Sequence, residues 1–494
     1  MSADQFLRSA NYPGGMSELT PRRKQLILAI CCLSLLIVGM DVTIVNIALP
    51  SISHDLHASL ADLQWTVDAY TVVLASLLML AGSTGDRLGR RRVFQIGLTV
   101  FVLGSLLCSL APSLGWLVAF RALQAIGGSM LNPVAMSIIT NVFTEPRERA
   151  RAIGVWGGVV GLSLGLGPLV GGTLIDSVGW RAIFWINIPI GLAALVLTVL
   201  FVPESRAPRA RRPDPVGQVL IIVLLAGMTY AIIESSRSGW STPTIVAAVL
   251  AGLALVALLR YEPRRTDPLI DLRFFRSVPF TGATVIAICA FGAFSGFLFL
   301  TTLYLQEVRG LSPVVAGLCT LPLAVMTLVC APLSGHIVGS RGPRLPLLAA
   351  GTLMCTGALL LVPLSGGESY PRLIASYVVF AAGFGFVNAP ITNTAVSGMP
   401  REQAGVAAAV ASTSRQVGAT LGVAVVGSVL ASGLTGPLRT SFVAASHAAW
   451  WLIAGCGFAV LILGAATTGP RAIASARRTA DLTAERPIEP VLAD

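Results

Sequence analysis

Long apolar runs restrict this chain to folds that a lipid bilayer can surround. A helix needs about 20 apolar residues to cross a core of roughly 30 Å, and on that criterion we predict about fourteen spans in the 494 residues. They begin near residues 25, 64, 93, 114, 152, 182, 216, 244, 280, 313, 345, 371, 403 and 446. Only 12% of the residues are charged, against roughly 25% in a soluble domain. The pattern therefore predicts an all-α membrane protein.

The basic residues predict the orientation of the spans. Most of the 34 Lys and Arg residues fall in the two tails or in every second loop. Because cytoplasmic loops of membrane proteins carry the excess of basic residues, we expect an even number of spans and both termini in the cytoplasm. This distribution accounts for the net charge of +11 without a nucleic-acid partner.

Two hydrophilic stretches divide the predicted spans into groups of six, two and six. They begin at Pro203 (PESRAPRARRPDP) and Tyr261 (YEPRRTDPLIDLRFFRS), and the second suits either the membrane interface or a plain charged linker. The predicted units are a tail (1–24), an N-terminal six-helix bundle (25–202), a basic loop with an inserted helix pair and a linker (203–279), a C-terminal six-helix bundle (280–468) and a second tail (469–494).

The sequence lacks the residues that ATP hydrolysis, nucleophilic catalysis or metal binding would require. A phosphate-binding loop of the form GxxxxGK[ST] needs a lysine, and the single lysine, Lys24, lies in PRRKQ. This excludes an ATP motor within the chain. We find no nucleophile with its base and no spacing typical of a metal site, so we predict no catalytic residue, no metal and no cofactor. A helical bundle with a few buried ionisable groups indicates an ion-coupled carrier rather than an enzyme.

A few polar side chains lie within the predicted spans, where charge is costly and usually functional. At 1.5 Å per helical residue, Asp41 and Arg121 lie at one level, roughly 12 Å and 10 Å inside the outer face. Asp68 is expected nearer water, roughly 6 Å in, where it could attract positive charge. Arg415 is expected near the midplane, and Asn132 is a further candidate for a substrate cavity. For each residue the alternative is a hydrogen-bonded structural group.

The fifth predicted span is rich in glycine. Its sequence VWGGVVGLSLGLGPLVGG lowers helix propensity by roughly 1 kcal/mol for each Gly. Small residues let helices approach closely in a membrane, and Pro168 can bend the helix. We interpret this span as a tight, bent helix, either at a moving interface or in static packing.

Taken together, these motifs resemble those of the major facilitator superfamily, specifically its fourteen-span drug:proton antiporters. MDVTIVNIALP from Met40 resembles the first-span motif, which contains Asp41, and FRALQAIGG resembles the fourth-span motif through Arg121, Gln124 and Gly127. GSTGDRLGRRR resembles the family's gating loop at Gly82, Asp86, Arg87, Gly89, Arg91 and Arg92. The antiporter motif is matched at Gly154, Gly167, Pro168, Gly171 and Gly172, with Ser163 where the family prefers Gly.

The resemblance implies two six-helix bundles plus two extra central helices in a bacterial inner (plasma) membrane. It implies proton-coupled efflux of hydrophobic, often cationic drugs by alternating access, with Asp41 and Arg121 in proton coupling. Asp86 would act as a gate, whereas the second copy of the loop has Gly339 at that position. The expected partners are such substrates, protons and the lipid bilayer, and a monomer suffices. A dedicated exporter of one endogenous metabolite and a transport-dead sensor remain as alternatives.

Overall fold

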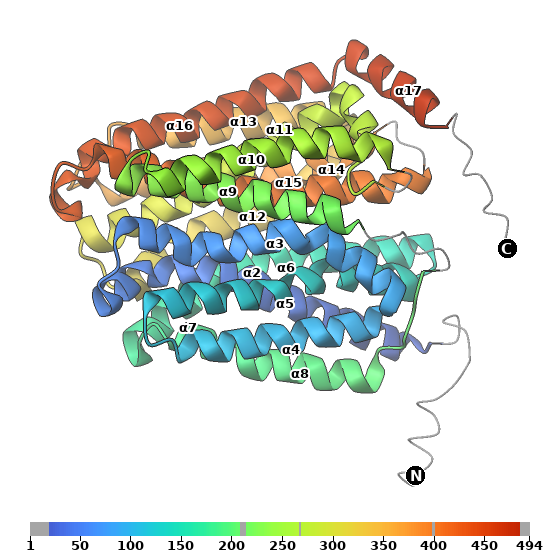
Figure 1. The fold of residues 1–494 in the computed structure, drawn as a ribbon, viewed down its shortest axis with the longest axis horizontal. Helices are drawn as coiled ribbons and strands as arrows, with labels where there is room; N and C mark the ends of the chain where they lie inside the picture. The colour runs from blue at the N-terminus through green and yellow to red at the C-terminus, as the bar shows by residue number, and fades with distance from the viewer. Residues whose placement is uncertain (1–18, 208–213, 266–267, 398–400, 485–494) are drawn as a thin grey trace, which may run out of the picture.

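The computed structural model describes residues 19–207, 214–265, 268–397 and 401–484. All regular structure in these ranges is helical, and the long helices lie side by side in one bundle (Figure 1). Both ends of the described chain leave the bundle at the same end, which we call the termini end, opposite the far end. Residues 1–18 of the predicted N-terminal tail and 485–494 of the predicted C-terminal tail lie outside the described residues.

The helices are described in three groups, in chain order. The N-terminal half contains α2 (Pro21–Leu56), α3 (Leu60–Leu88), α4 (Arg90–Ser109), α5 (Leu114–Val142), α6 (Pro146–Val178), α7 (Ala182–Trp185) and α8 (Asn187–Phe201). The inserted pair is α9 (Pro215–Ser238) and α10 (Thr242–Tyr261), followed by the 3-10 turns η2 (Glu262–Arg264) and η3 (Leu272–Arg276). The C-terminal half contains α11 (Val278–Leu303), the π-helical turn η4 (Tyr304–Val308), α12 (Pro313–Arg341), α13 (Arg344–Leu359), α14 (Tyr370–Val396), α15 (Arg401–Gly433), α16 (Leu438–Thr467) and α17 (Pro470–Ala484).

The predicted spans agree with these helices. In the described residues, 13 helical segments are long and apolar enough to cross a membrane, with α7 and α8 together forming one of them. The remaining predicted span corresponds to α13, which is apolar but shorter, at 16 residues. The largest difference is at α16, which begins at Leu438. The predicted start near 446 is later because the first turn of the helix is polar and interrupts the apolar run.

Local signals set the start of α3. Helix α2 ends where His57 adopts a left-handed conformation with φ 51°. Two residues later, Ser59 and Asp62 form a capping box, in which Ser59 Oγ accepts from the Asp62 backbone N–H and Asp62 accepts from that of Ser59 at 2.9 Å. The helix therefore begins at Leu60, one turn earlier than the sequence predicted. Each later residue of α3 lies correspondingly further from the start of the helix.

The inserted pair lies beside the two halves. Helix α9 packs against α3 of the N-terminal half and α15 of the C-terminal half, whereas α10 packs mainly on α9. Gln218 on α9 donates to the Ser76 carbonyl at 2.6 Å, and Ser428 on α15 donates to the Ile232 carbonyl at 2.9 Å. The pair is central in the sequence, but in space it covers one side of the junction between the halves.

Candidate functional site

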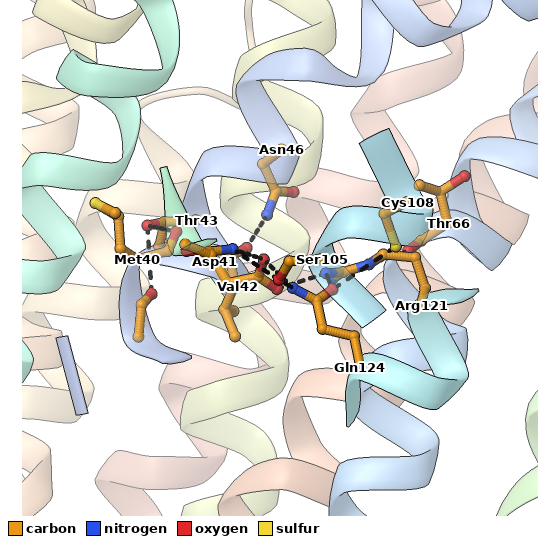
Figure 2. A network of polar contacts seen from close by, with 12 residues as sticks. Met40, Asp41, Val42, Thr43, Asn46, Thr66, Ser105, Cys108, Arg121 and Gln124 are labelled. Atoms are coloured by element: carbon orange, nitrogen blue, oxygen red, sulfur yellow. Dashed lines mark hydrogen bonds and ion pairs between the residues drawn. The ribbon is translucent and has the colours of Figure 1, made fainter. Parts of the chain in front are cut away.

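Asp41, on α2, lies fully buried at the centre of a polar cluster in the N-terminal half (Figure 2). Its Oδ2 accepts a hydrogen bond from Arg121 Nη1 at 2.5 Å, and the two groups form an ion pair. Its Oδ1 accepts from the amides of Gln124 at 2.8 Å and Asn187 at 3.1 Å. Ser105 Oγ accepts from the same two amides at 2.8 and 3.4 Å. All three groups that contact Asp41 are donors, so both of its oxygens accept hydrogen bonds.

Arg121, on α5, is held by three helices. Its Nη1 also donates to Gln124 Oε1 at 2.6 Å, which fixes the orientation of that amide, and its Nε donates to the Thr66 carbonyl at 3.3 Å. Its Cζ lies 4.3 Å from the centroid of the Tyr70 ring, a favourable position for a cation. A charge that is 99% buried is therefore balanced by Asp41 and contacted on several sides.

Glycines bring α4 close enough to α5 to complete the cluster. A Cβ on Gly104 would lie 2.6 Å from the Cα of Gln124, and a Cβ on Gly127 would overlap the backbone N of Phe101. Such close contact is typical of small residues in membrane helices. It places Ser105 on α4 within hydrogen-bond distance of Gln124.

The sequence predicted that Asp41 and Arg121 lie at one level, and the structure brings them into direct contact. It did not identify Asn187 or Ser105 as their neighbours. Asn187 lies in GWRAIFWINIPIG, a segment similar to the fourteen-span group, but no role could be assigned to it. Ser105 carries no signal, because a serine in an apolar span is common.

The expectation that Asp68 lies nearer water is wrong. Its side chain has no exposed surface. Its Oδ1 accepts from Thr71 Oγ1 at 3.3 Å, and its Oδ2 has no hydrogen-bond partner among the described residues. One turn away, Gln64 donates to the carbonyls of Val423 at 3.3 Å and Ala424 at 2.9 Å. Asp68 lies on α3, which packs against both α9 and α15.

The other two candidate cavity residues lie outside the Asp41 cluster. Asn132 follows Arg121 on α5 by roughly 16 Å along the helix axis, and its Oδ1 is buried without a partner among the described residues. Arg415, on α15, donates to the Thr392 hydroxyl and, at 3.4 Å, to the Asn388 carbonyl. The structure therefore separates the predicted substrate residues from the predicted coupling pair.

The predicted gating loop joins α3 to α4 and is held by a residue that the sequence did not reveal. Gly89 has φ 117°, and a Cβ there would lie 2.7 Å from the Glu204 carboxylate. Glu204 accepts from the backbone N–H groups of Arg91 at 3.1 Å and Arg92 at 3.3 Å, at the start of α4. A carboxylate at a helix N-terminus is stabilising. Glu204 thus fixes the loop from the segment that follows α8.

Within the same loop, Asp86 is bound to its own half. Its Oδ1 accepts from Arg90 Nη2 at 2.8 Å and Nε at 3.0 Å. Gly82 faces Pro133 on α5, with 3.6 Å of room for a Cβ, and Arg87 is exposed. The described side-chain contacts of Asp86 lie within the N-terminal half, and its backbone carbonyl accepts from the Ala207 N–H at 3.0 Å, in the segment after α8.

The glycines of the antiporter motif place α6 directly against α2. A Cβ on Gly167 would overlap Thr43 Oγ1, and one on Gly171 would lie 2.5 Å from Ile44 Cγ1. Thr43 and Ile44 are separated from Asp41 by less than one helical turn. The packing of α6 is therefore coupled to the segment that carries Asp41.

The opposite side of α6 contacts α12 of the C-terminal half. A Cβ on Gly172 would lie 2.6 Å from the Pro313 carbonyl oxygen, and a Cβ on Gly317 would overlap the Pro168 carbonyl oxygen. By contrast, Gly154 lies on α6 towards the termini end, and a Cβ on it would meet nothing within 4 Å. The two helices thus touch at the far end and diverge towards the termini end.

Polar contacts also join the halves at the far end. Asp176 Oδ2 accepts from the backbone N–H of Val314 at 3.2 Å, and Gln306 Nε2 donates to the Ile47 carbonyl at 2.8 Å. On α12, Gly335 has open space around it, like Gly154 on α6. The described residues therefore close the bundle at the far end.

Comparison with known proteins agrees with this architecture. The family model described as Major Facilitator Superfamily matches residues 31–423. The Multidrug resistance protein Stp of Mycobacterium tuberculosis is 38% identical over 408 residues, which cover 82% of this chain and 76% of that protein. The Tetracenomycin C resistance and export protein of Streptomyces glaucescens is 38% identical over 399 residues, 80% of this chain and 74% of that protein. The Multidrug efflux pump LfrA of Mycolicibacterium smegmatis is 35% identical over 417 residues, 83% of this chain and 81% of that protein.

A solved structure supports the same fold. The crystal structure of a bacterial homologue of the human lysosomal transporter Spinster, in an inward-facing and unoccupied conformation, has a TM-score of 0.62. That alignment covers 93% of this chain and 98% of the other at 17% identity. The fold, the matched family model and the drug-efflux and antibiotic-resistance relatives lead to one conclusion: the chain belongs to the major facilitator superfamily of membrane transporters.

Proposed function

We propose that this protein exports hydrophobic small molecules across the bacterial inner membrane in exchange for protons, by alternating access. The observation that carries the proposal is the buried ion pair between Asp41 and Arg121, because an ionisable pair at membrane depth is costly without a function. The arrangement of basic residues supports a cytoplasmic location for both termini. The contacts at the far end would then close the pathway to the outside.

Proton exchange would act through Asp41. In the described arrangement its carboxylate accepts bonds from Arg121, Gln124 and Asn187. A proton arriving from outside would neutralise Asp41, remove the counter-ion of Arg121 and favour a different packing of the cluster. Because α2 contacts the glycine face of α6, and α6 contacts α12, this change would alter the contact between the halves. Release of the proton to the cytoplasm would restore the present arrangement.

The gating loop would stabilise the opposite state. In the described arrangement, Asp86 binds Arg90 of its own half. When the halves close at the termini end, Asp86 would become available to the facing half and would favour the outward-facing state. Gly339 provides no acid at the corresponding place on the other half, so the gate would depend mainly on the first loop.

The relatives support drugs and antibiotics as cargo. Two of them are a multidrug resistance protein and a multidrug efflux pump, and a third is a resistance and export protein for tetracenomycin C. The third relative favours the second candidate, a dedicated exporter of one endogenous metabolite. Growth inhibition by a panel of dyes and antibiotics, with and without expression, separates the two: protection against many unrelated compounds supports multidrug export, and protection against one supports the dedicated exporter.

The test of proton coupling uses inverted membrane vesicles that contain the protein and a fluorescent hydrophobic dye such as ethidium. We expect dye uptake when respiration establishes a proton gradient, and loss of that uptake when a protonophore is added. ATP should not support uptake in vesicles that cannot form the gradient. Vesicles without the protein provide the background. Uptake that continues after the gradient has collapsed would refute the proposal.

A further inference from the structure

Arg415 is a half-buried charge without a counter-ion among the described residues. It lies in the middle of α15 and donates through Nη2 to the Thr392 hydroxyl and the Asn388 carbonyl, both on α14. Its Nε is buried and has no hydrogen-bond partner, and no described carboxylate lies within 4.0 Å of its guanidinium. Two neutral acceptors do not cancel the charge of a guanidinium at membrane depth, so the described side chains leave this charge uncompensated.

The other charged side chains deep in the bundle are already satisfied or sealed. Asp41 and Arg121 neutralise each other at 2.5 Å, and Asp68 has no exposed surface. Arg415 alone among these four keeps part of its surface accessible. It also lies in the part of the bundle towards the termini end, where α6 and α12 diverge. A charged cargo molecule entering there would meet a cation rather than an acid.

An aromatic surface adjoins the Arg415 guanidinium. The ring centroid of Phe291, on α11, lies 5.9 Å from Arg415 Cζ. Phe291 packs edge-on against Phe384 of α14 at 5.1 Å, and Phe384 stacks on Phe294 at 4.0 Å. Phe384 and Phe294 are buried, whereas Phe291 is only half-buried and presents an apolar aromatic surface beside the guanidinium, which can bind a carboxylate through two parallel hydrogen bonds.

We propose that Arg415 binds the anionic group, a carboxylate or phenolate, of an aromatic cargo molecule between α11, α14 and α15. This inference rests on the proposed export function and refines its substrate class. It departs from the expectation of cationic cargo, because the acids on which that expectation depended are paired or sealed in the structure. Cargo with both a cation and an acid group would still bind through the acid group.

The test compares two dyes that differ only in the acid group: tetramethylrhodamine, which carries a free carboxylate, and its methyl ester. Their dissociation constants are measured by fluorescence anisotropy on purified protein in nanodiscs at pH 7.5, with empty nanodiscs as background. We expect the free acid to bind at least ten-fold more tightly than the ester. Arg415→Gln should abolish this difference and leave ester affinity within two-fold, which also shows that the variant is folded.

Two further variants sharpen the result. Arg415→Lys keeps the charge but not the two-pronged geometry, so it should retain part of the preference for the acid. Arg471→Gln removes an exposed arginine on α17 and should retain all of it. If the wild type binds acid and ester equally, or if Arg415→Gln weakens both dyes alike, the proposal is wrong. Because binding at equilibrium needs no gradient, either result would leave the proton-coupled export test unaffected.

Discussion

Replacement of Asp41 by Asn should destabilise the folded protein strongly, although the two side chains have nearly the same size. Asp41 Oδ2 accepts from Arg121 and Oδ1 accepts from Gln124 and Asn187. An Asn side chain has one acceptor oxygen, so its NH₂ group must face either a guanidinium or two amide donors. Arg121 is then left as a charge that is 99% buried and has no counter-ion. Breaking a buried pair in this way costs about 3–5 kcal/mol.

The measurement is a double-mutant cycle on purified protein in detergent, followed by reversible denaturant unfolding. Asp41→Asn should lose about 3–5 kcal/mol of unfolding free energy, whereas Asp41→Asn combined with Arg121→Gln should recover more than half of the loss, because the uncompensated charge is gone. The control is Glu148→Gln, which removes an exposed pair with Lys24 at 3.0 Å. Such a pair contributes at most about 1 kcal/mol.

A small loss in Asp41→Asn, comparable to that of Glu148→Gln, would refute the reasoning. It would show that Arg121 finds another partner or that water reaches the site. If Asp41→Asn combined with Arg121→Gln is no more stable than Asp41→Asn alone, the loss of unfolding free energy is explained by side-chain shape rather than by the uncompensated charge. In either stability outcome, we expect Asp41→Asn to abolish proton-coupled export of charged and neutral cargo alike.

Three further predictions follow from the geometry. Gly172→Ala should weaken closure at the far end, because the added Cβ would lie 2.6 Å from the α12 backbone. Thiol labelling of cysteines engineered at the far end should then increase. The control Gly154→Ala, whose Cβ would lie in open space, should leave this labelling unchanged. Asp86→Asn should impair export at matched expression but keep equilibrium dye binding within two-fold, because Asp86 contacts Arg90 rather than cargo; a large loss of binding would contradict this. Asp68→Asn should change export of neutral, singly charged and doubly charged cargo by the same factor, because the Asp68 side chain has no exposed surface. The measurement is a resistance profile across such compounds, and a selective loss for dications would overturn this prediction.

The sequence predicted the fold class and the approximate positions of the spans because both depend on local signals. Apolar runs and alternating basic loops locate the spans wherever the chain folds, and the capping box at Ser59 and Asp62 shows why α3 began earlier than the hydropathy indicated. Contact between Asp41 and Arg121 was also predictable, since two opposite charges at one depth of a bilayer have few other partners.

Contacts that depend on packing could not be predicted. Depth from a helix end does not reveal which face of α3 is covered, so Asp68 was placed near water although α9 and α15 bury it. Ser105 and Asn187 are neutral polar residues of common types, and their role depends on how closely α4 approaches α5 and α8 approaches α2. Glu204 lies in a charged loop, where an acid that caps α4 cannot be distinguished from a solvated one.

The central claim is that Asp41 exchanges its proton for cargo, and proton release on cargo binding tests it most directly. Purified protein in weakly buffered solution, with a pH indicator, is titrated with a dye that it exports, and the protons released per molecule bound are counted between pH 5 and pH 8. We expect proton release from the wild type, and none from Asp41→Asn although the dye still binds. Equal proton release from the wild type and Asp41→Asn would contradict the account.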